Sequence, residues 1–255
     1  MFKKKFVLAA TFGALIFNPI NFNFTPTACA AEAVSSDWLT EGNDFFDAGD
    51  FNSAIQCYNQ GLKINSADDV AWNNLGVAYY HLKNYGRAVD CLKKSLKFAQ
   101  DDKITWCNLG NVYFAQKNYD AAIDCFQNAT EIDSNYSNAW FKLGLSYQRL
   151  ENFEDAIDCY KKSVNRDSKN ASAWNNLGVA YYYLENYSQA VKCYQRALKL
   201  NAKDANSWNN LGNAYRKQDL HERAAEAYKR AVDLEPENKY YKKNLDDTLA
   251  NLPQK

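Results

Sequence analysis

The fold is decided by the stretch Trp174-Asn175-Asn176-Leu177-Gly178-Val179-Ala180-Tyr181. Its Trp, Leu, Gly and Tyr follow one another at intervals of 3, 1 and 3 residues, which places all four on one face of a helix. The chain of 255 residues repeats this stretch with a period of 34, as its tryptophans show: Trp38, Trp72, Trp106, Trp140, Trp174 and Trp208. A fixed period of this length is typical of stacked helical repeats.

A second helical pattern completes each repeat. An Ala stands sixteen residues after each Trp, and four residues later comes an aromatic residue or Leu: Tyr58, Leu92, Phe126, Tyr160, Tyr194 and Tyr228. We expect the Gly and the Ala to lie where two helices approach closely, with the large residue filling the gap opposite. Polar clusters such as Asp133-Ser134-Asn135 supply turns and helix N-caps. The sequence thus predicts six helix–turn–helix units, at 35–68, 69–102, 103–136, 137–170, 171–204 and 205–238.

This pattern resembles the tetratricopeptide repeat (TPR) family. The sixth unit meets almost the whole family signature, W-x2-L-G-x2-Y…A-x3-F…A…P, with Trp208, Leu211, Gly212, Tyr215, Ala224, Tyr228, Ala231 and Pro236. The resemblance implies an all-α fold, a right-handed α-solenoid. The first unit departs from the signature with Glu41 and Phe45, which suits a terminal repeat with one solvated face. Residues 239–255 are predicted to form an amphipathic capping helix and a tail.

Residues 1–30 are predicted to be a signal peptide. Three lysines precede the apolar run 6–17, and Ala28-Cys29-Ala30 has the small-x-small form of a cleavage site. The expected protein is therefore an exported TPR protein of bacterial type, periplasmic or secreted, with no membrane span in the mature chain. Cleavage after Ala33 stays open, as do two minor alternatives: a lipid anchor at Cys29 and an uncleaved signal.

Composition and spacing argue against catalysis and against nucleic acid. The chain carries 30 basic and 30 acidic residues, without the basic excess of a nucleic-acid binder. His81 and His221 are far apart, and five cysteines recur every 34 residues rather than at the two-to-four-residue spacing of zinc ligands. We expect no enzyme, no cofactor and no metal. The periodic cysteines are interpreted as small, half-buried packing residues on the second helices, with a redox or metal ladder as the rival interpretation.

The resemblance also implies where a partner binds, because the first helix of each TPR hairpin lines a concave groove. The residue two after each Trp belongs to that helix: Thr40, Asn74, Asn108, Lys142, Asn176 and Asn210. Asn is a mediocre helix former, and its amide offers both donor and acceptor groups to a peptide backbone. The series is similar to the asparagine ladder of the O-linked N-acetylglucosamine transferase. The alternative is that Asn here is only repeat consensus.

The remaining groove candidates are Asn43, Tyr80, Phe114, Phe141, Tyr182 and Tyr183. They predict a groove that is apolar and aromatic in its middle and basic towards its end. Chaperone-binding TPR proteins grip a C-terminal carboxylate with Lys and Arg side chains of the groove, an arrangement called a carboxylate clamp. Such a clamp is not expected here, because Leu39, Ile104 and Asn108 stand where it has basic residues. The predicted function is a non-catalytic scaffold that binds an extended segment of another protein. A self-associating array, and hence a homo-oligomer, and a binder of glycan or another non-protein ligand are the alternatives.

Overall fold

The computed structural model describes residues 28–252, with side chains from residue 35 onward. Within this range the chain forms helices joined by short turns and no strands. The helices are α1 (Ala28–Asp47), α2 (Phe51–Ile64), α3 (Asp69–His81), α4 (Tyr85–Phe98), α5 (Lys103–Ala115), α6 (Tyr119–Ile132), α7 (Ser137–Arg149), α8 (Phe153–Arg166), α9 (Ala171–Tyr183), α10 (Tyr187–Leu200), α11 (Ala205–Arg216), α12 (His221–Leu234) and α13 (Lys239–Ala250).

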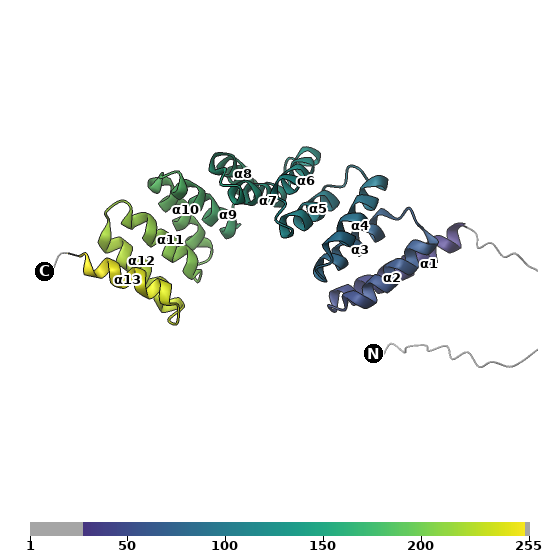
Figure 1. Ribbon diagram of the computed structural model, residues 1–255, viewed down its shortest axis with the longest axis horizontal. Coiled ribbons are helices and arrows are strands. Elements are labelled where there is room, and N and C mark those ends of the chain that lie inside the picture. Colours follow the sequence, from purple (N-terminus) through teal and green to yellow (C-terminus); the bar gives the residue numbers. More distant parts are fainter. Residues whose placement is uncertain (1–27, 253–255) are drawn as a thin grey trace, which may run out of the picture.

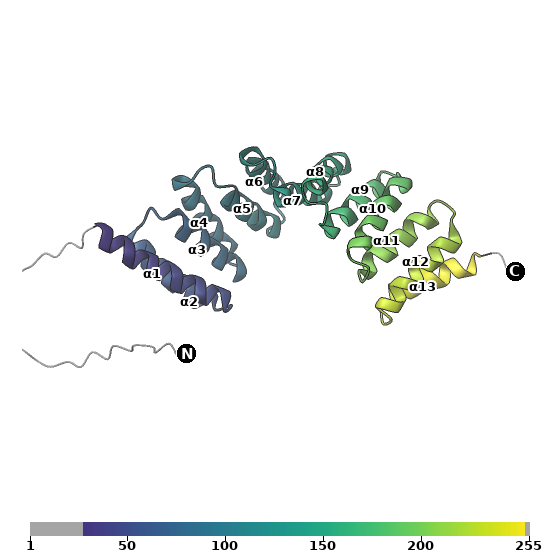
Figure 2. The same ribbon diagram turned by 180° about the vertical axis from the view of Figure 1, so that it is seen from behind.

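Successive helices pair into six hairpins, which we number units 1 to 6, and α13 closes the stack. The hairpins form an open arch with α1 and α2 at one foot and α12 and α13 at the other (Figures 1 and 2). Each first helix packs against its own second helix and also contacts the first helix of the next unit. The first helices therefore lie on the inner side of the arch, with α6 and α8 on its outer rim (Figure 1). The predicted fold class, an all-α solenoid, is confirmed.

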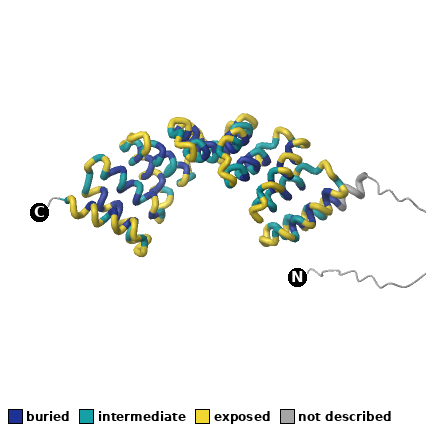
Figure 3. Tube along the Cα trace, viewed as in Figure 1, coloured by how far each residue is buried: buried dark blue, intermediate teal, exposed yellow. Residues whose placement is uncertain are grey.

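A close contact between Gly and a large side chain holds the two helices of each hairpin together. In the first helices a Cβ on any of the signature glycines would lie 2.5–2.7 Å from the opposing side chain, which is closer than real Cβ contacts. The opposing residues, each of which is at most 2% exposed, are Tyr58, Leu92, Phe126, Tyr160, Tyr194 and Tyr228. The expected role of the Gly and the large residue is confirmed. The core is a series of small clusters, each shared between neighbouring hairpins, and buried residues accordingly recur along the whole arch (Figure 3).

The regular recurrence of Trp has a separate cause, at the junction between units. In units 2 to 6 the indole Nε1–H donates to a backbone carbonyl six residues earlier, at 2.8–3.0 Å. That carbonyl lies in the turn that enters the unit, so each Trp fixes the turn to the first helix. Trp174, for example, donates to the carbonyl of Ser168.

Caps and turns repeat with the same period. Asn84, Asn118, Asn152 and Asn186 cap the second helices of units 2 to 5, each side chain accepting a hydrogen bond from a backbone N–H of the first turn. The residue before each of these caps has a positive φ of 58–62°, although it is Lys or Glu rather than Gly. Unit 1 places Gly49 at this position, with φ of 79°. The backbone of the hairpin therefore requires a left-handed residue at each turn.

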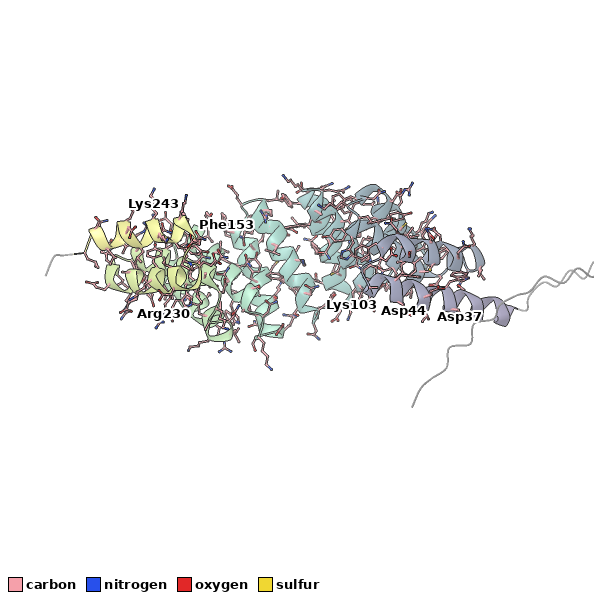
Figure 4. The ribbon with its side chains drawn as sticks, turned by 90° about the horizontal axis from the view of Figure 1, so that it is seen from below. Asp37, Asp44, Lys103, Phe153, Arg230 and Lys243 are labelled. Atoms are coloured by element: carbon pink, nitrogen blue, oxygen red, sulfur yellow. The ribbon has the colours of Figure 1, made fainter. Side chains whose placement is uncertain are left out.

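The turns divide the arch into two long edges. Turns between units lie on one edge and turns within units on the other. Figure 4, which views the arch from below, shows Lys103, the first residue of α5, and Phe153, the first residue of α8, on opposite sides. No helix in residues 28–252 has the combined length and hydropathy that spanning a bilayer requires.

The N-terminal predictions lie almost wholly outside the described residues. Residues 1–27, which hold most of the predicted signal peptide, are not described. Helix α1 begins at Ala28, ahead of residue 35, where we place the start of unit 1. The early start has a physical reason, since four alanines between residues 28 and 33 favour helix strongly.

Gly178→Ala should test the interhelical contact. The new methyl group would lie 2.6 Å from the Tyr194 ring, and we expect a loss of about 1–3 kcal/mol in the free energy of unfolding from overpacking. Urea unfolding followed by circular dichroism measures the change. Gly86→Ala is the matched control, because a Cβ there meets nothing within 4 Å. Equal stability of the two variants would contradict the close contact.

Candidate peptide-binding groove

The concave side of the arch holds two hollows. The smaller, of about 160 Å³, lies between units 2 and 3 and is lined by Val77, Tyr80, His81, Leu92, Asn108, Asn111 and Val112. The larger, of about 480 Å³, lies between unit 5, unit 6 and α13, and its lining includes Val179, Asn213, Arg216 and Tyr240. Five predicted groove residues line these hollows: Tyr80 and Asn108 in the first, and Tyr182, Tyr183 and Asn210 in the second. The structure therefore gathers part of the predicted site into two separate places.

The predicted asparagine series takes part in hydrogen bonds between units. The Nδ2 of Asn108 donates to the Oδ1 of Asn73 at 2.9 Å, and the Nδ2 of Asn210 donates to the Oδ1 of Asn175 at 3.3 Å. In each pair the donor belongs to one first helix and the acceptor to the first helix of the preceding unit. We call these contacts the inter-unit amide pairs. They give the series a structural role that sequence reasoning missed.

A third pair joins the closing helix to the stack. Asn244 in α13 donates to Asn209 at 2.8 Å, and both side chains are buried. The acceptors Asn73, Asn175 and Asn209 all directly follow a Trp. The doublet Asn-Asn after Trp72, Trp174 and Trp208 is the signal that could have revealed the pairing, because its first Asn accepts from the next unit.

The pairing is interrupted at the centre of the arch. The residues that follow Trp106 and Trp140 are Cys107 and Phe141, whose side chains offer no amide acceptor. Asn176 instead donates to the backbone carbonyl of Ser172 in its own helix at 2.9 Å. Lys142 is half-buried and acts electrostatically on the Cys107 thiol. Phe141 lies 6.0 Å from the ring of Tyr160, at the edge of the unit 4 core.

Asn43 holds a different position in the groove. Its Oδ1 accepts from the Tyr58 hydroxyl at 2.9 Å and from the Nδ2 of Asn74 at 3.0 Å. In unit 6 the equivalent Asn213 accepts from the Tyr228 hydroxyl at 2.7 Å. Burial raises the pKa of Tyr58 to about 12, so this hydroxyl stays protonated and donates. These amides thus satisfy the tyrosine hydroxyls that reach the concave surface from the core.

Aromatic side chains follow the edge of the groove that carries the turns within units. Phe114 lies 5.3 Å from Tyr119, and Tyr80 lies 6.0 Å from Tyr85, each pair spanning the two helices of one hairpin. Tyr183 stacks on Phe153 of the preceding unit with ring centroids 4.6 Å apart and planes within 3°. Tyr183 is nevertheless 62% exposed, so one face of this stack stays open to a ligand.

Most of the cysteines belong to the core clusters that neighbouring hairpins share. Cys57, Cys91, Cys107, Cys125, Cys159 and Cys193 are buried and unpaired, where we expected half-burial for the periodic five. Burial raises the pKa of Cys91 to about 11 and of Cys107, Cys125, Cys159 and Cys193 to about 12. A protonated, buried thiol is a poor nucleophile and a poor metal ligand. These environments favour the packing interpretation.

An arch of stacked hairpins with a concave surface defines a helical-repeat solenoid, and sequence comparison agrees. Residues 66–254 match the family described as the cilia and flagella-associated protein 70 C-terminal domain, and residues 42–83 match the family described as TPR repeat. The first match spans well over half of the chain. The chain therefore belongs to the family of tetratricopeptide repeat domains.

Individual relatives support the same fold. A TPR repeat-containing protein of Methanocaldococcus jannaschii is 39% identical over 46 residues, which is 18% of this chain and 8% of that relative. Among solved structures, pilF of Pseudomonas aeruginosa has a TM-score of 0.73 at 17% identity, over 87% of this chain and 99% of its own. YrrB, described as a TPR protein with an unusual peptide-binding site, has a TM-score of 0.65 at 19% identity, over 73% of this chain and 96% of its own. MamA has a TM-score of 0.60 at 28% identity, over 65% of this chain and 96% of its own.

The buried cysteines should resist thiol reagents in the folded chain. At a pH of about 8.5, the ordinary pKa of a free thiol, we expect modification of the Cys29→Ser variant to be at least about a hundredfold slower than that of a free cysteine. The raised pKa values leave little thiolate to react. Release of colour from a disulfide reagent measures the rate, and the chain unfolded in guanidinium is the control. Fast modification with unchanged helicity would support the redox interpretation.

Two equivalent asparagines should differ in their effect on stability. Asn210→Ala removes an inter-unit amide pair, whereas Asn176→Ala removes only a bond within its own helix. Both changes replace Asn by Ala at the same helical position, so the helix propensity gained is common to both. We expect Asn210→Ala to be less stable than Asn176→Ala by about 0.5–1.5 kcal/mol in urea unfolding. The opposite order would argue that the amide pair does not hold the units together.

Proposed function

We propose that this protein is a non-catalytic interaction scaffold that binds an extended peptide segment of a partner in its concave groove. The observation that carries the proposal is the larger hollow, where Tyr182, Tyr183 and Tyr240 surround the amides of Asn210 and Asn213. Tyr183 and Tyr240 are 62% and 58% exposed. Large aromatic rings that stay accessible beside polar groups are characteristic of binding surfaces.

The amides support peptide binding even though they pair with one another. A side-chain amide has two N–H donors and an oxygen acceptor, and each inter-unit amide pair uses one N–H of its donor residue. Asn108 and Asn210 are half-buried, so their other groups face the groove in reach of a backbone. The pair also fixes each side chain in one orientation, which reduces the entropy lost on binding. The same asparagines would thus serve both the stack and its ligand.

The family and its members support this function. TPR proteins bind other proteins, and YrrB is described as having a peptide-binding site on the same fold. In this proposal the chain performs no catalysis and takes no cofactor or metal. It is exported through the signal peptide at residues 1–30 and meets a partner in the periplasm or outside the cell. A lipid anchor at Cys29 and retention by an uncleaved signal are the alternatives to release.

Replacing the two groove tyrosines should abolish partner binding. We expect wild-type residues 31–255 to retain a partner from the envelope fraction of the source cells, and the Tyr182→Ser, Tyr183→Ser variant to lose it. Loss of aromatic anchors costs about 2 kcal/mol or more each, equivalent to at least about thirtyfold in affinity. Phe98→Ser is the matched control, because Phe98 is 52% exposed and lines neither hollow.

Three other outcomes would count against the proposal. A partner retained by both variants would place the site on the convex face or at the ends of the arch. Absence of any partner with concentration-dependent light scattering would favour the self-associating array. Absence of any partner with retention of envelope glycans would favour the aromatic groove as a glycan site.

A further inference from the structure

The inner side of the arch lacks carboxylates over most of its length. The first helices of units 3 to 6, which are α5, α7, α9 and α11, contain no Asp or Glu. The chain as a whole carries 30 acidic residues, and many of them stand on the second helices α6, α8 and α12. In an overall neutral protein, four successive first helices thus carry no negatively charged side chain.

The same helices carry cations without an acidic partner. Among the described residues the ion pairs are Lys103–Asp133, Lys161–Asp158 and His221–Asp219, so Lys142, Arg149 and Arg216 have none. Arg149 lies over the ring of Phe114 in the preceding unit, at 5.8 Å from the ring centroid. The first helices of units 4 and 6 therefore carry positive charge, and the first helix of unit 5 between them is uncharged.

Of these three cations, Arg216 is the one that lines the larger hollow. It is half-buried and lines the 480 Å³ hollow, whose other lining residues are tyrosines, asparagines and Val179, with no carboxylate among them. Its charge acts on Tyr182, opposing the rise in pKa that burial causes at that hydroxyl. A guanidinium that loses part of its hydration needs an anionic partner to recover the cost. Among the described residues no carboxylate pairs with Arg216, so an anionic ligand would provide the missing partner.

The spacing of the cations favours a peptide over a polyanion. Nucleic acid carries a charge every ~1.7 Å, far denser than three cations spread over three units. Arg149 in unit 4 and Arg216 in unit 6 are two units apart, or roughly 16–20 Å at a helix spacing of 8–10 Å. An extended chain advancing about 3.3 Å per residue covers this distance in about five or six residues. Val179 and Tyr182 lie between the cations and offer apolar contact to the residues between the charges.

From these observations we infer that the groove selects an acidic extended segment, in which two carboxylates about five or six residues apart pair with Arg149 and Arg216. The inference rests on the proposed function and adds the chemical class of the partner. Both cations are guanidinium groups, which bind a carboxylate through two parallel hydrogen bonds. Specificity would arise from this pair of charges, since the amides read only backbone.

Selection from a random library should reveal the preference. A library of displayed 12-residue peptides is panned against the whole chain and against its Arg149→Gln, Arg216→Gln variant. We expect that panning against the wild type enriches clones with Asp or Glu residues separated by five or six positions. Panning against the variant should give no such enrichment. The control Arg196→Gln removes an exposed cation on α10, outside the groove, and should select the same acidic clones as the wild type.

Affinity measurements on the selected peptides complete the test. Arg216→Gln should weaken binding of an acidic clone by about tenfold or more, while a clone with Gln in place of its acids should bind both forms equally. Neutral clones that still depend on Tyr182 and Tyr183 would overturn the acidic preference and leave the proposed function standing. Failure to select any clone would overturn both. Displacement of acidic clones by polygalacturonate, with direct binding of that polysaccharide, would assign the cations to an acidic glycan instead.

Discussion

The close packing of Gly against a large side chain is the constraint on which the structure depends. Each hairpin brings a Gly of its first helix to within a few ångströms of a Tyr, Phe or Leu of its second, at a distance that leaves no room for a Cβ. The large residue of this contact also belongs to the core cluster that its hairpin shares with a neighbour. The hairpins then bury the rest of their apolar surface against one another, so that no unit is complete without a neighbour.

Polar contacts decide how neighbouring hairpins meet. The Trp indole ties the entering turn to its helix, and the inter-unit amide pairs join one first helix to the next. Both contacts recur along the chain, but the amide pairs are missing on either side of unit 4, where Cys107 and Phe141 replace the acceptor. The arch thus has amide-linked segments towards each end, and at its centre a hydrogen bond from Gln127 to the Tyr147 hydroxyl joins units 3 and 4 instead. The two hollows lie in the amide-linked segments.

The amide series shows how stability and binding can share one set of residues. From the sequence, the Asn found two residues after four of the six Trp residues is predicted to hold a ligand, with repeat consensus as the alternative, because Asn is a mediocre helix former. The structure shows that the same amides satisfy groups of the neighbouring unit, which explains their presence without a ligand. Their remaining groups still face the groove. A binding surface whose side chains are already oriented by the fold needs little reorganisation to accept an extended peptide.

The sequence by itself determined the repeat, its length and its helical hairpins, because the 34-residue period of Trp, Gly and a large residue admits little else. The resemblance to TPR proteins also indicated the aromatic groove candidates, because it implies that the first helix of each hairpin lines the groove. Only the tertiary structure decided which of them meet. Amide pairing joins residues 35 positions apart, which no local pattern predicts. The left-handed backbone at Lys83 and Glu185 could not be predicted either, because neither residue is glycine. The gathering of Tyr182, Tyr183, Asn210 and Arg216 around one hollow likewise depends on α13 closing the stack, and the curvature that brings these elements together arises from packing between units rather than from any local pattern.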